Sequence, residues 1–299
     1  VYANTLYEPL DPFYRDQHWS HITDWKAELA PHYAQAKKML GVATYPGTST
    51  ADELMRAVAE DYGVADSFHN ADMGVLFGGE PGAEVPDPYF GGVGPTRRNC
   101  IECGACMTGC RHNAKNTLVK NYLHLAESAG AEVRALTTVT DVRPRDGGGY
   151  DVRTRRTGNP LRRRTFSAEQ VVFAGNALNT QKLLHGLRRR SLPNLSPRIG
   201  ELSRTNSEAV LSARSADKRA DFTHGVAITS SWHPDEHTHV EPVRYGRGSS
   251  ALALMNAPLV DKDQGVSLLR GGARLYRKMC FRGSFLLHKM GGDTLTWWG

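Results

Sequence analysis

The chain has 299 residues, of which 40% are hydrophobic and 23% charged, a composition typical of globular proteins. Its 37 Lys and Arg against 31 Asp and Glu give a formal charge of +6, but the basic clusters Arg153–Arg164 and Arg188–Arg190 lack the interleaved aromatic residues of a nucleic-acid site. We therefore expect no nucleic-acid partner, and we expect no transmembrane segment because no apolar run approaches about 18 residues.

The first 23 residues are rich in aromatic residues and proline, which predicts an irregular covering segment. Asp24 can cap a short helix directly after it. Pro31 suits the first turn of a second helix, which ends near Leu40 because Gly41 follows.

Residues 50–53 read Thr-Ala-Asp-Glu, which has the form of a capping box. The pattern predicts a helix from Thr50 to about Tyr62, stopped by Gly63. Residues 69–99 are rich in Gly and Pro and are expected to form a long ordered loop.

The loop leads into a stretch that holds four of the five cysteines at the spacing C-x2-C-x2-C-x3-C, the same as an iron–sulfur run of bacterial ferredoxins. Gly104 and Gly109 allow the backbone to fold tightly enough for the sulfurs to converge. Basic neighbours favour thiolate over thiol. The cysteines are Cys100, Cys103, Cys106 and Cys110.

Three interpretations of these cysteines stay open. The first is a [4Fe–4S] cluster on the first three, with Cys110 or Cys280 as the fourth ligand, although Arg111 stands where ferredoxins have proline. The second is a zinc ion on four thiolates, although structural zinc usually uses two separated knuckles. The third is a structural loop with free thiols or a disulfide.

The residues from 116 to 199 predict an α/β pattern with a three-stranded antiparallel meander in the middle. A short apolar run without alternation follows the meander and is typical of a buried parallel strand. The order fits the middle of a flavin-binding doubly wound domain, and it also fits other α/β proteins. The expected elements are helix 116–129, strands 133–142, 150–156 and 161–167, buried strand 171–175 and helix 178–187.

Residues 200–299 lack βα alternation and predict a mostly antiparallel sheet. Its expected strands are 225–231, 239–245, 251–255, 285–290 and 294–298. The fold class is therefore α/β, or α+β overall. The expected regions are a covering segment 1–23, a helical and loop cap 24–115 with the Cys-rich loop, a partial cofactor domain 116–199 and a partial substrate domain 200–299.

Several long motifs occur together in one order, and with them the chain resembles the glucose–methanol–choline (GMC) flavin oxidoreductases, closely their actinobacterial cholesterol oxidase branch. The motifs are Val1-Tyr-Ala-Asn-Thr-Leu-Tyr-Glu-Pro9, Trp19-Ser-His-Ile-Thr-Asp-Trp25, Val85-Pro-Asp-Pro-Tyr-Phe-Gly-Gly92, Cys103-Gly-Ala-Cys-Met-Thr-Gly-Cys-Arg-His112, Ala114-Lys-Asn-Thr-Leu-Val-Lys-Asn-Tyr-Leu123, Ala227-Ile-Thr-Ser-Ser231 and Thr238-His-Val-Glu-Pro-Val-Arg-Tyr-Gly246.

The resemblance implies an FAD-dependent oxidation of a sterol 3β-hydroxyl, with O2 or another electron acceptor. A dehydrogenase of another hydrophobic alcohol and an iron–sulfur electron-transfer module are the alternatives. The family's Gly-rich pyrophosphate motif is not found, and the family's catalytic His and Asn would lie beyond Gly299. We therefore expect an internal fragment that is inactive alone. Because family members generally work with FAD alone, the resemblance favours a structural Cys-rich loop.

The resemblance also implies three cofactor positions. Tyr2, Ala3, Asn4 and Thr5 resemble the segment that runs past the isoalloxazine ring. Val139 resembles the residue whose backbone meets the adenine, and Ala174 with Gly175 resembles the strand end near the ADP half of FAD.

Substrate positions are expected in the segment from about 203 to 255, where His224, His239 and Glu241 are the main ionisable candidates. The others are His233, His237 and Arg244. Some cholesterol oxidases use a buried carboxylate to move the steroid double bond. Glu241 is the nearest match, but its register falls several residues short.

Overall fold

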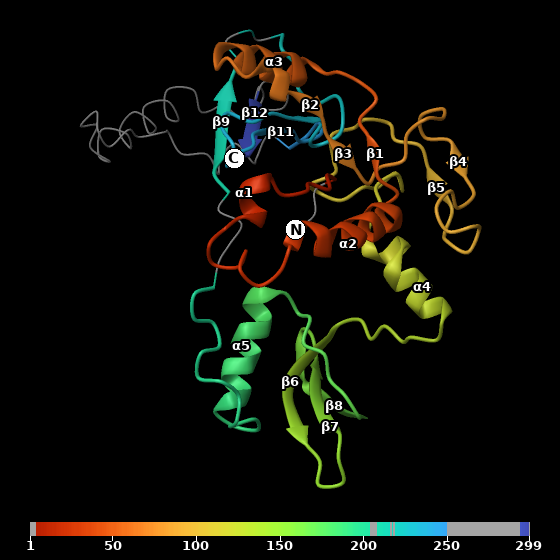
Figure 1. Cartoon of the computed structure of the whole chain (residues 1–299). Coiled ribbons are helices and arrows are strands. Elements are labelled where there is room, and N and C mark those ends of the chain that lie inside the picture. The colour runs from red at the N-terminus through yellow and green to blue at the C-terminus, as the bar shows by residue number, and fades with distance from the viewer. Residues whose placement is uncertain (1–3, 204–207, 216, 218, 250–293, 299) are drawn as a thin grey trace, which may run out of the picture. The chain divides into compact units, whose positions relative to one another are not determined.

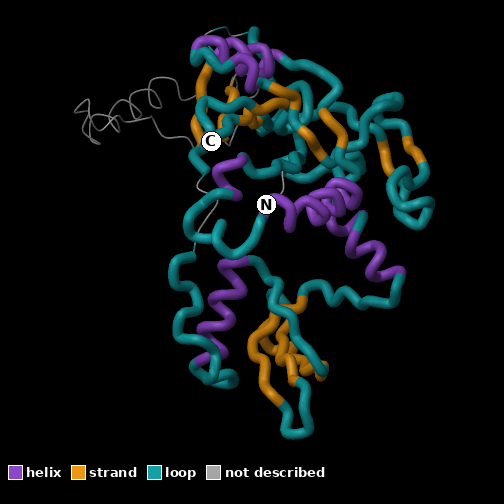
Figure 2. Tube along the Cα trace, in the orientation of Figure 1, coloured by secondary structure: helices purple, strands orange, loops and turns teal. Residues whose placement is uncertain are grey.

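The computed structural model describes residues 4–203, 208–215, 217, 219–249 and 294–298 (Figure 1). The chain divides into two compact units, one formed by Val1–Ala129 with Glu208–Gly299 and the other by Gly130–Ser207. Both contain helices and antiparallel strands, and loops form much of the trace (Figure 2). No helix among the described residues has the length and apolar character needed to cross a membrane.

In the first unit, α1 (Asp11–Tyr14) precedes one long helix, α2 (Trp25–Leu40), instead of the two helices predicted on either side of Pro31. Asp24 caps α2 by accepting a hydrogen bond from the Ala27 N–H at 3.1 Å, as predicted. Gly41 ends it in a left-handed conformation with φ of 56°. Capping at both ends offsets the single backbone hydrogen bond that Pro31 removes.

The next helix, α3 (Thr50–Asp61), confirms the predicted position but not the predicted cap. Ser49 and Asp52 form the capping box, one residue before the predicted pair of Thr50 and Glu53. Asp52 is buried, whereas Glu53 is exposed. The register follows from tertiary contacts that the local pattern does not contain.

The predicted helix 116–129 is divided into a 3₁₀ turn, η2 (Leu118–Lys120), and a shorter helix, α4 (Tyr122–Ser128). The break lies at Asn121, whose Oδ1 accepts a hydrogen bond from the Tyr122 N–H and whose Nδ2 donates to the Met39 carbonyl at 3.0 Å. This fully buried side chain fixes where α4 begins.

Short antiparallel ladders connect the remaining segments of the first unit. The predicted strands 225–231 and 239–245 are shorter in the structure, as β10 (Ser230–Ser231) and β11 (Glu241–Val243), and the predicted strand 294–298 is confirmed as β12 (Thr294–Trp298). The predicted strands 251–255 and 285–290 lie outside the described residues. Three ladders have two strands each: β1 (Ala43–Thr44) with β3 (Asp72–Met73), β2 (His69–Asn70) with β10, and β4 (Glu84–Val85) with β5 (Arg97–Arg98). In a three-stranded sheet, β12 lies between β11 and β9 (Val210–Arg214). A 3₁₀ turn, η1 (Ala65–Ser67), precedes β2.

The core of this unit lies where the segment around β3 meets residues 226–228. Met73, Val75 and Val226 are fully buried there, and the Cys-rich loop packs against them. A second cluster joins α3, through Met55, to Trp232. The Cys-rich loop is therefore part of the hydrophobic core of the unit.

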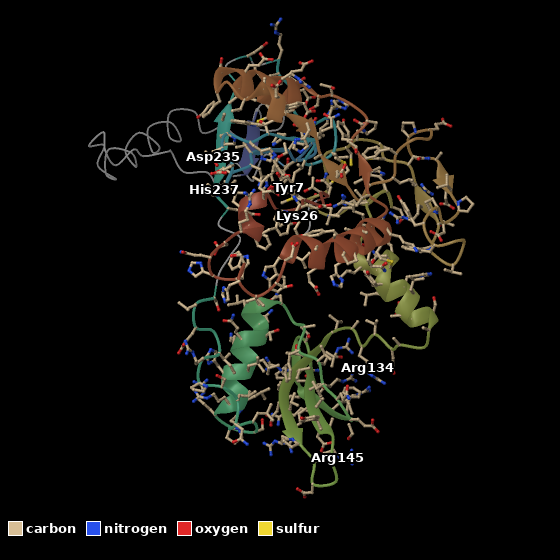
Figure 3. All side chains as sticks on the ribbon, in the orientation of Figure 1. Tyr7, Lys26, Arg134, Arg145, Asp235 and His237 are labelled. Atoms are coloured by element: carbon tan, nitrogen blue, oxygen red, sulfur yellow. The ribbon has the colours of Figure 1, made fainter. Side chains whose placement is uncertain are left out.

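The second unit confirms the predicted antiparallel meander, formed by β6 (Thr137–Pro144), β7 (Tyr150–Arg156) and β8 (Asn159–Ala168), and the helix after it, α5 (Ala177–Arg188). Arg134 and Arg145, labelled in Figure 3, belong to this unit. The Arg134 guanidinium lies 4.6 Å from the centre of the Phe166 ring, and Arg145 Nε lies 3.7 Å from an Asp151 carboxylate oxygen.

The prediction of a buried parallel strand at 171–175 is wrong for this structure. The segment belongs to no strand, and Val172 is 87% exposed. A parallel strand needs neighbouring strands on its edges, and every ladder among the described strands is antiparallel. The coarse fold, helices with antiparallel strands, is confirmed.

Candidate functional site

Of the four residues predicted to run past the flavin ring, Asn4 and Thr5 are described and are anchored in the first unit, whereas Tyr2 and Ala3 lie outside the described residues. Asn4 is fully buried, donates from Nδ2 to the Ile228 carbonyl at 2.7 Å and accepts from the Ile228 N–H at 3.1 Å. Thr5 pairs with Met73 in an antiparallel bridge. The Asn4 amide therefore holds the chain in place and is satisfied by backbone.

The predicted adenine positions belong to the second unit. Val139 lies on β6 and is 37% exposed. Ala174 and Gly175 are exposed just before α5, whose N-terminus Asn176 caps through the Asn179 N–H at 3.0 Å. A Cβ added at Gly175 would meet only Thr180 Oγ1, at 3.6 Å.

The backbone at Ala174 and Gly175 is thus exposed and uncrowded, which would let a cofactor approach closely. The residues that the prediction assigns to FAD are divided between the two units, with Asn4 and Thr5 in the first and Val139, Ala174 and Gly175 in the second. That one FAD molecule contacts both groups of residues stays a prediction.

Among the predicted substrate residues, His239 lies in a cluster of rings in the first unit. The Tyr7 ring stacks on His239 with centroids 4.0 Å apart, and the Tyr7 hydroxyl lies 3.2 Å from His233 Nε2. His69 stacks on His233 at 5.6 Å. His224 does not join this cluster: its side chain is exposed, and its carbonyl accepts a hydrogen bond from Arg244.

Burial sets the protonation of this cluster. It lowers the pKa of His233 and His239, so both imidazoles are neutral near pH 7, and it raises the pKa of Tyr7 to about 12. Neutral imidazoles can accept a proton or donate a hydrogen bond. The roles of Tyr7 and His69 were missed in the sequence, because only the fold brings them to His233.

Glu241 is the second predicted substrate residue with an unusual environment. It is only 7% exposed on β11, and its Oε1 has no hydrogen-bond partner among the described residues. Burial, with a smaller contribution from the charge of Glu208, raises its pKa to about 7. A carboxyl group that titrates near neutrality can both take and give a proton.

An open cleft of about 420 Å³ reaches this ring cluster at His233. One side of the cleft is formed by α1 and the residues just before that helix, and the other by the turn that follows His233. Figure 3 labels Tyr7, Asp235 and His237 in this region. Charged side chains make up half of its lining, namely Asp11, Arg15, Asp235 and Glu236. Such a lining suits a polar entrance better than a site for an apolar ring system.

The Cys-rich loop is folded by residues in the left-handed region. Gly104 and Gly109 have φ of 68° and 105°, as the sequence led us to expect, and Glu102 and Asn113 share this conformation. Gly104 donates to the Gly225 carbonyl at 2.8 Å, and a Cβ on Gly104 would lie 2.8 Å from the Thr223 carbonyl oxygen. The loop is thus fixed against residues 223–225.

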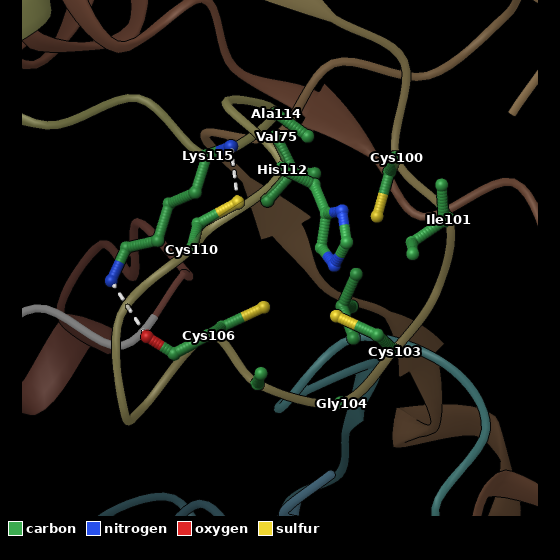
Figure 4. A pocket seen from close by; sticks show the side chains of 12 residues that line it. Val75, Cys100, Ile101, Cys103, Gly104, Cys106, Cys110, His112, Ala114 and Lys115 are labelled. Carbon is green, nitrogen blue, oxygen red and sulfur yellow. Dashed lines mark hydrogen bonds between the residues drawn. The ribbon is translucent and has the colours of Figure 1, made fainter. Parts of the chain in front are cut away.

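The four cysteines of this loop line one small cavity together with Val75, His112 and Lys115 (Figure 4). All four are free thiols, so the disulfide interpretation is not observed. The cavity has a volume of about 10 Å³, room for roughly one water molecule. The iron–sulfur, zinc and structural interpretations of the four cysteines therefore all concern the same cavity.

The thiols differ in acidity. Burial raises the pKa of Cys100 to about 12 and raises that of Cys106. Burial also acts on Cys110, but backbone N–H groups led by that of Lys115 outweigh it and hold its pKa below the usual value. Among the described residues, no group of three or more Cys, His, Asp or Glu side chains is arranged to hold a metal ion.

Comparison with known proteins gives two kinds of match. Residues 94–201 match the family model described as GMC oxidoreductase. Proteins named cholesterol oxidase from Mycobacterium tuberculosis are 55% identical over 269 residues, which is 87% of this chain and 46% of theirs. One from Acinetobacter baumannii is 43% identical over 266 residues, 85% of this chain and 48% of its own. The chain spans about half the length of these curated relatives.

Proposed function

We propose that this chain belongs to the GMC oxidoreductases, and that the whole protein oxidises the 3β-hydroxyl group of a sterol with FAD as its cofactor. The observation that carries the proposal is the 55% identity to proteins named cholesterol oxidase over 87% of the chain. The electron acceptor is O2 or another oxidant. FAD, when bound, would supply the hydride acceptor, and a base would take the proton of the hydroxyl group.

The second unit would hold the adenine half of the cofactor. Val139 and the backbone at Ala174 and Gly175 are exposed, and an uncrowded backbone before a helix N-terminus suits a dinucleotide. In the whole protein we place this unit in a doubly wound FAD-binding domain, in which residues 171–175 would gain neighbouring strands.

The first unit would hold the segment along the flavin ring. Asn4 and Thr5 support this role because they fix the backbone that leads to Tyr2 and Ala3. The buried Asn4 amide anchors the segment to residue 228. Ordering this segment in advance lowers the entropic cost of cofactor binding.

Glu241 favours a second step after the oxidation. Moving a steroid double bond requires a group that removes a proton from one carbon and returns it to another. Glu241 is buried, its Oε1 lacks a partner among the described residues, and its pKa is about 7. We therefore include double-bond migration in the proposed function.

The full-length protein tests the proposal. We expect it to purify with bound flavin and to convert cholesterol to a ketone, measured by chromatography of the products and by O2 consumption or dye reduction. Choline and a short primary alcohol serve as comparison substrates. A colourless protein, or one that oxidises only the comparison alcohols, would contradict sterol oxidation.

A matched pair of glycine variants tests the adenine position. Neither Gly175 nor Gly147 has a positive φ, and a Cβ meets nothing closer than 3.6 Å at the first and nothing within 4 Å at the second. Gly175→Val should leave folding intact and weaken FAD binding about tenfold or more, measured by flavin fluorescence titration. Gly147→Val, in the turn between β6 and β7, should bind FAD normally. Equal affinities would argue against this placement.

A further inference from the structure

The four thiols of the Cys-rich loop are not needed for the proposed sterol chemistry, yet their side chains meet at one place. In Figure 4 the four sulfur atoms point into the space between them. They come from a single loop of eleven residues, Cys100 to Cys110, and they line the same cavity. The loop is fixed to the core through Gly104 and Gly225, so the convergence is built into the fold.

The arrangement differs from that of a mononuclear zinc site. Four sulfurs on one zinc ion lie about 3.8 Å apart, since each Zn–S bond is about 2.3 Å and the geometry is tetrahedral. No such group of ligands for one ion occurs among the described residues. A cluster of several metal ions joins thiolates that stand farther apart, because each sulfur binds its own metal.

Backbone donors and a cation surround these sulfurs. The Glu102 N–H donates to Cys100 Sγ at 3.3 Å, and the Lys115 N–H donates to Cys110 Sγ at 3.5 Å. The buried Lys115 ammonium group donates to the Cys106 carbonyl at 3.1 Å, which keeps its positive charge beside the loop. Hydrogen bonds to sulfur and nearby charge are the features with which proteins stabilise and tune anionic iron–sulfur clusters.

We propose that the loop binds one [4Fe–4S] cluster, with Cys100, Cys103, Cys106 and Cys110 each bound to one iron. In two-cluster ferredoxins the fourth Cys of this spacing binds the other cluster. Here Cys110 lines the same cavity as the first three, and Arg111 replaces the proline that follows it there.

Cluster binding requires more space than the cavity of about 10 Å³ offers. The proposal therefore requires the His112 ring, which lines the cavity in Figure 4 and belongs to an exposed residue, to turn outward when the cluster binds. Three other lining residues, Val75, Ala114 and Val226, are apolar and buried and would shield that side of a cluster from water.

Metal and sulfide analysis of the full-length protein, purified without oxygen, tests the proposal. We expect about four iron and four acid-labile sulfide per chain and no stoichiometric zinc. After reduction with dithionite, we expect a fast-relaxing EPR signal that is distinct from a flavin radical. FAD is measured separately, so the cluster and the flavoenzyme proposal fail independently.

Single variants locate the ligands. Cys103→Ser and Cys110→Ser should each lose most of the iron, whereas Cys280→Ser, which removes the remaining cysteine, should keep it. Far-UV circular dichroism and bound FAD show whether each variant folds; if the loop variants do not fold, the iron, sulfide and EPR data on the unaltered protein decide. Absence of iron and sulfide after anaerobic reconstitution, zinc without sulfide, or full iron in both loop variants would overturn the proposal.

Discussion

At the residue scale, burial turns ordinary side chains into groups with unusual chemistry. Glu241, His233 and His239 look like common polar residues in the sequence, but the fold buries Glu241 and partly buries the two histidines. A buried charge is costly, so each group shifts toward its neutral form. The position of Glu241 among the substrate candidates was predicted from a resemblance, but its environment came only from the structure.

The pKa of Glu241 gives a prediction for stability. Its folded-state pKa of about 7 lies above the ordinary value of 4.5 for this carboxyl group, so the folded protein holds an extra proton between these pH values. Stability contributed by Glu241 is therefore full below about pH 4.5 and is lost as pH rises through about 7, by on the order of 3 kcal/mol in total.

Urea unfolding of the unaltered protein and of Glu241→Gln between pH 5 and 8 measures this difference. The unaltered protein should lose stability relative to the variant as pH rises. Glu236→Gln, which alters an exposed carboxyl group, should follow the unaltered protein. Parallel curves for Glu241→Gln and the unaltered protein would show that Glu241 does not titrate in this range. The same variant should oxidise sterol but lose double-bond migration.

At the element scale, short helices and two-residue strands are positioned by polar side chains as much as by apolar ones. Asn4 connects the N-terminal segment to residue 228, Asn121 begins α4, and Asp52 joins α3 to β10. Each of these side chains is fully or almost fully buried and hydrogen-bonded. Such contacts fix the register of segments that are too short to choose it by periodicity alone.

The cap of α3 leads to a prediction for the stability of an Asp52 variant. Asp52 accepts hydrogen bonds from the Ser49 N–H at 2.8 Å and from the Ser230 hydroxyl at 2.6 Å, and it also bonds Thr229. Asp52→Ala removes the cap and leaves buried hydroxyl groups unsatisfied, which should cost about 3 kcal/mol.

Glu53 provides the matched control, because it lies in the same first turn and is exposed. Glu53→Ala should cost less than about 0.5 kcal/mol. Chemical unfolding of both variants measures the difference. Equal stabilities would show that Asp52 does not act as the cap, and a larger loss for Glu53→Ala would favour the predicted pair of Thr50 and Glu53.

At the scale of the whole molecule, the two units differ in how many of their apolar side chains are buried. The first contains two clusters of buried apolar residues. In the second, the buried side chains of the described residues are Asp141, Val142, Thr154 and Leu187. Leu161 on β8 and Leu178 on α5 are 89% and 77% exposed, so the meander and α5 need a further surface to bury their apolar residues.

This contrast predicts that the segment 130–207 does not fold stably by itself. Its buried apolar surface is too small to offset the entropy of ordering the chain. We expect a broad thermal transition by circular dichroism and strong binding of the dye ANS. A sharp, cooperative transition without dye binding would contradict this expectation and would mean that the unit is a self-sufficient domain.

The sequence by itself determined the local features of this protein. The meander, the positions of α3 and α5, the end of α2 at Gly41 and the turns at Gly104 and Gly109 all follow from periodicity and from backbone conformations that only certain residues adopt. The motifs also pointed to the family of the relatives, because a similarity between sequences can be recognised without knowledge of the fold.

Only the tertiary structure decided which distant residues meet. It placed Tyr7 on His239, buried Glu241, moved the α3 cap to Asp52 and left residues 171–175 outside any sheet. It also placed all four thiols on one cavity, where the sequence left open which of them act together. Burial and long-range contacts depend on segments far apart in the chain, so no local pattern encodes them.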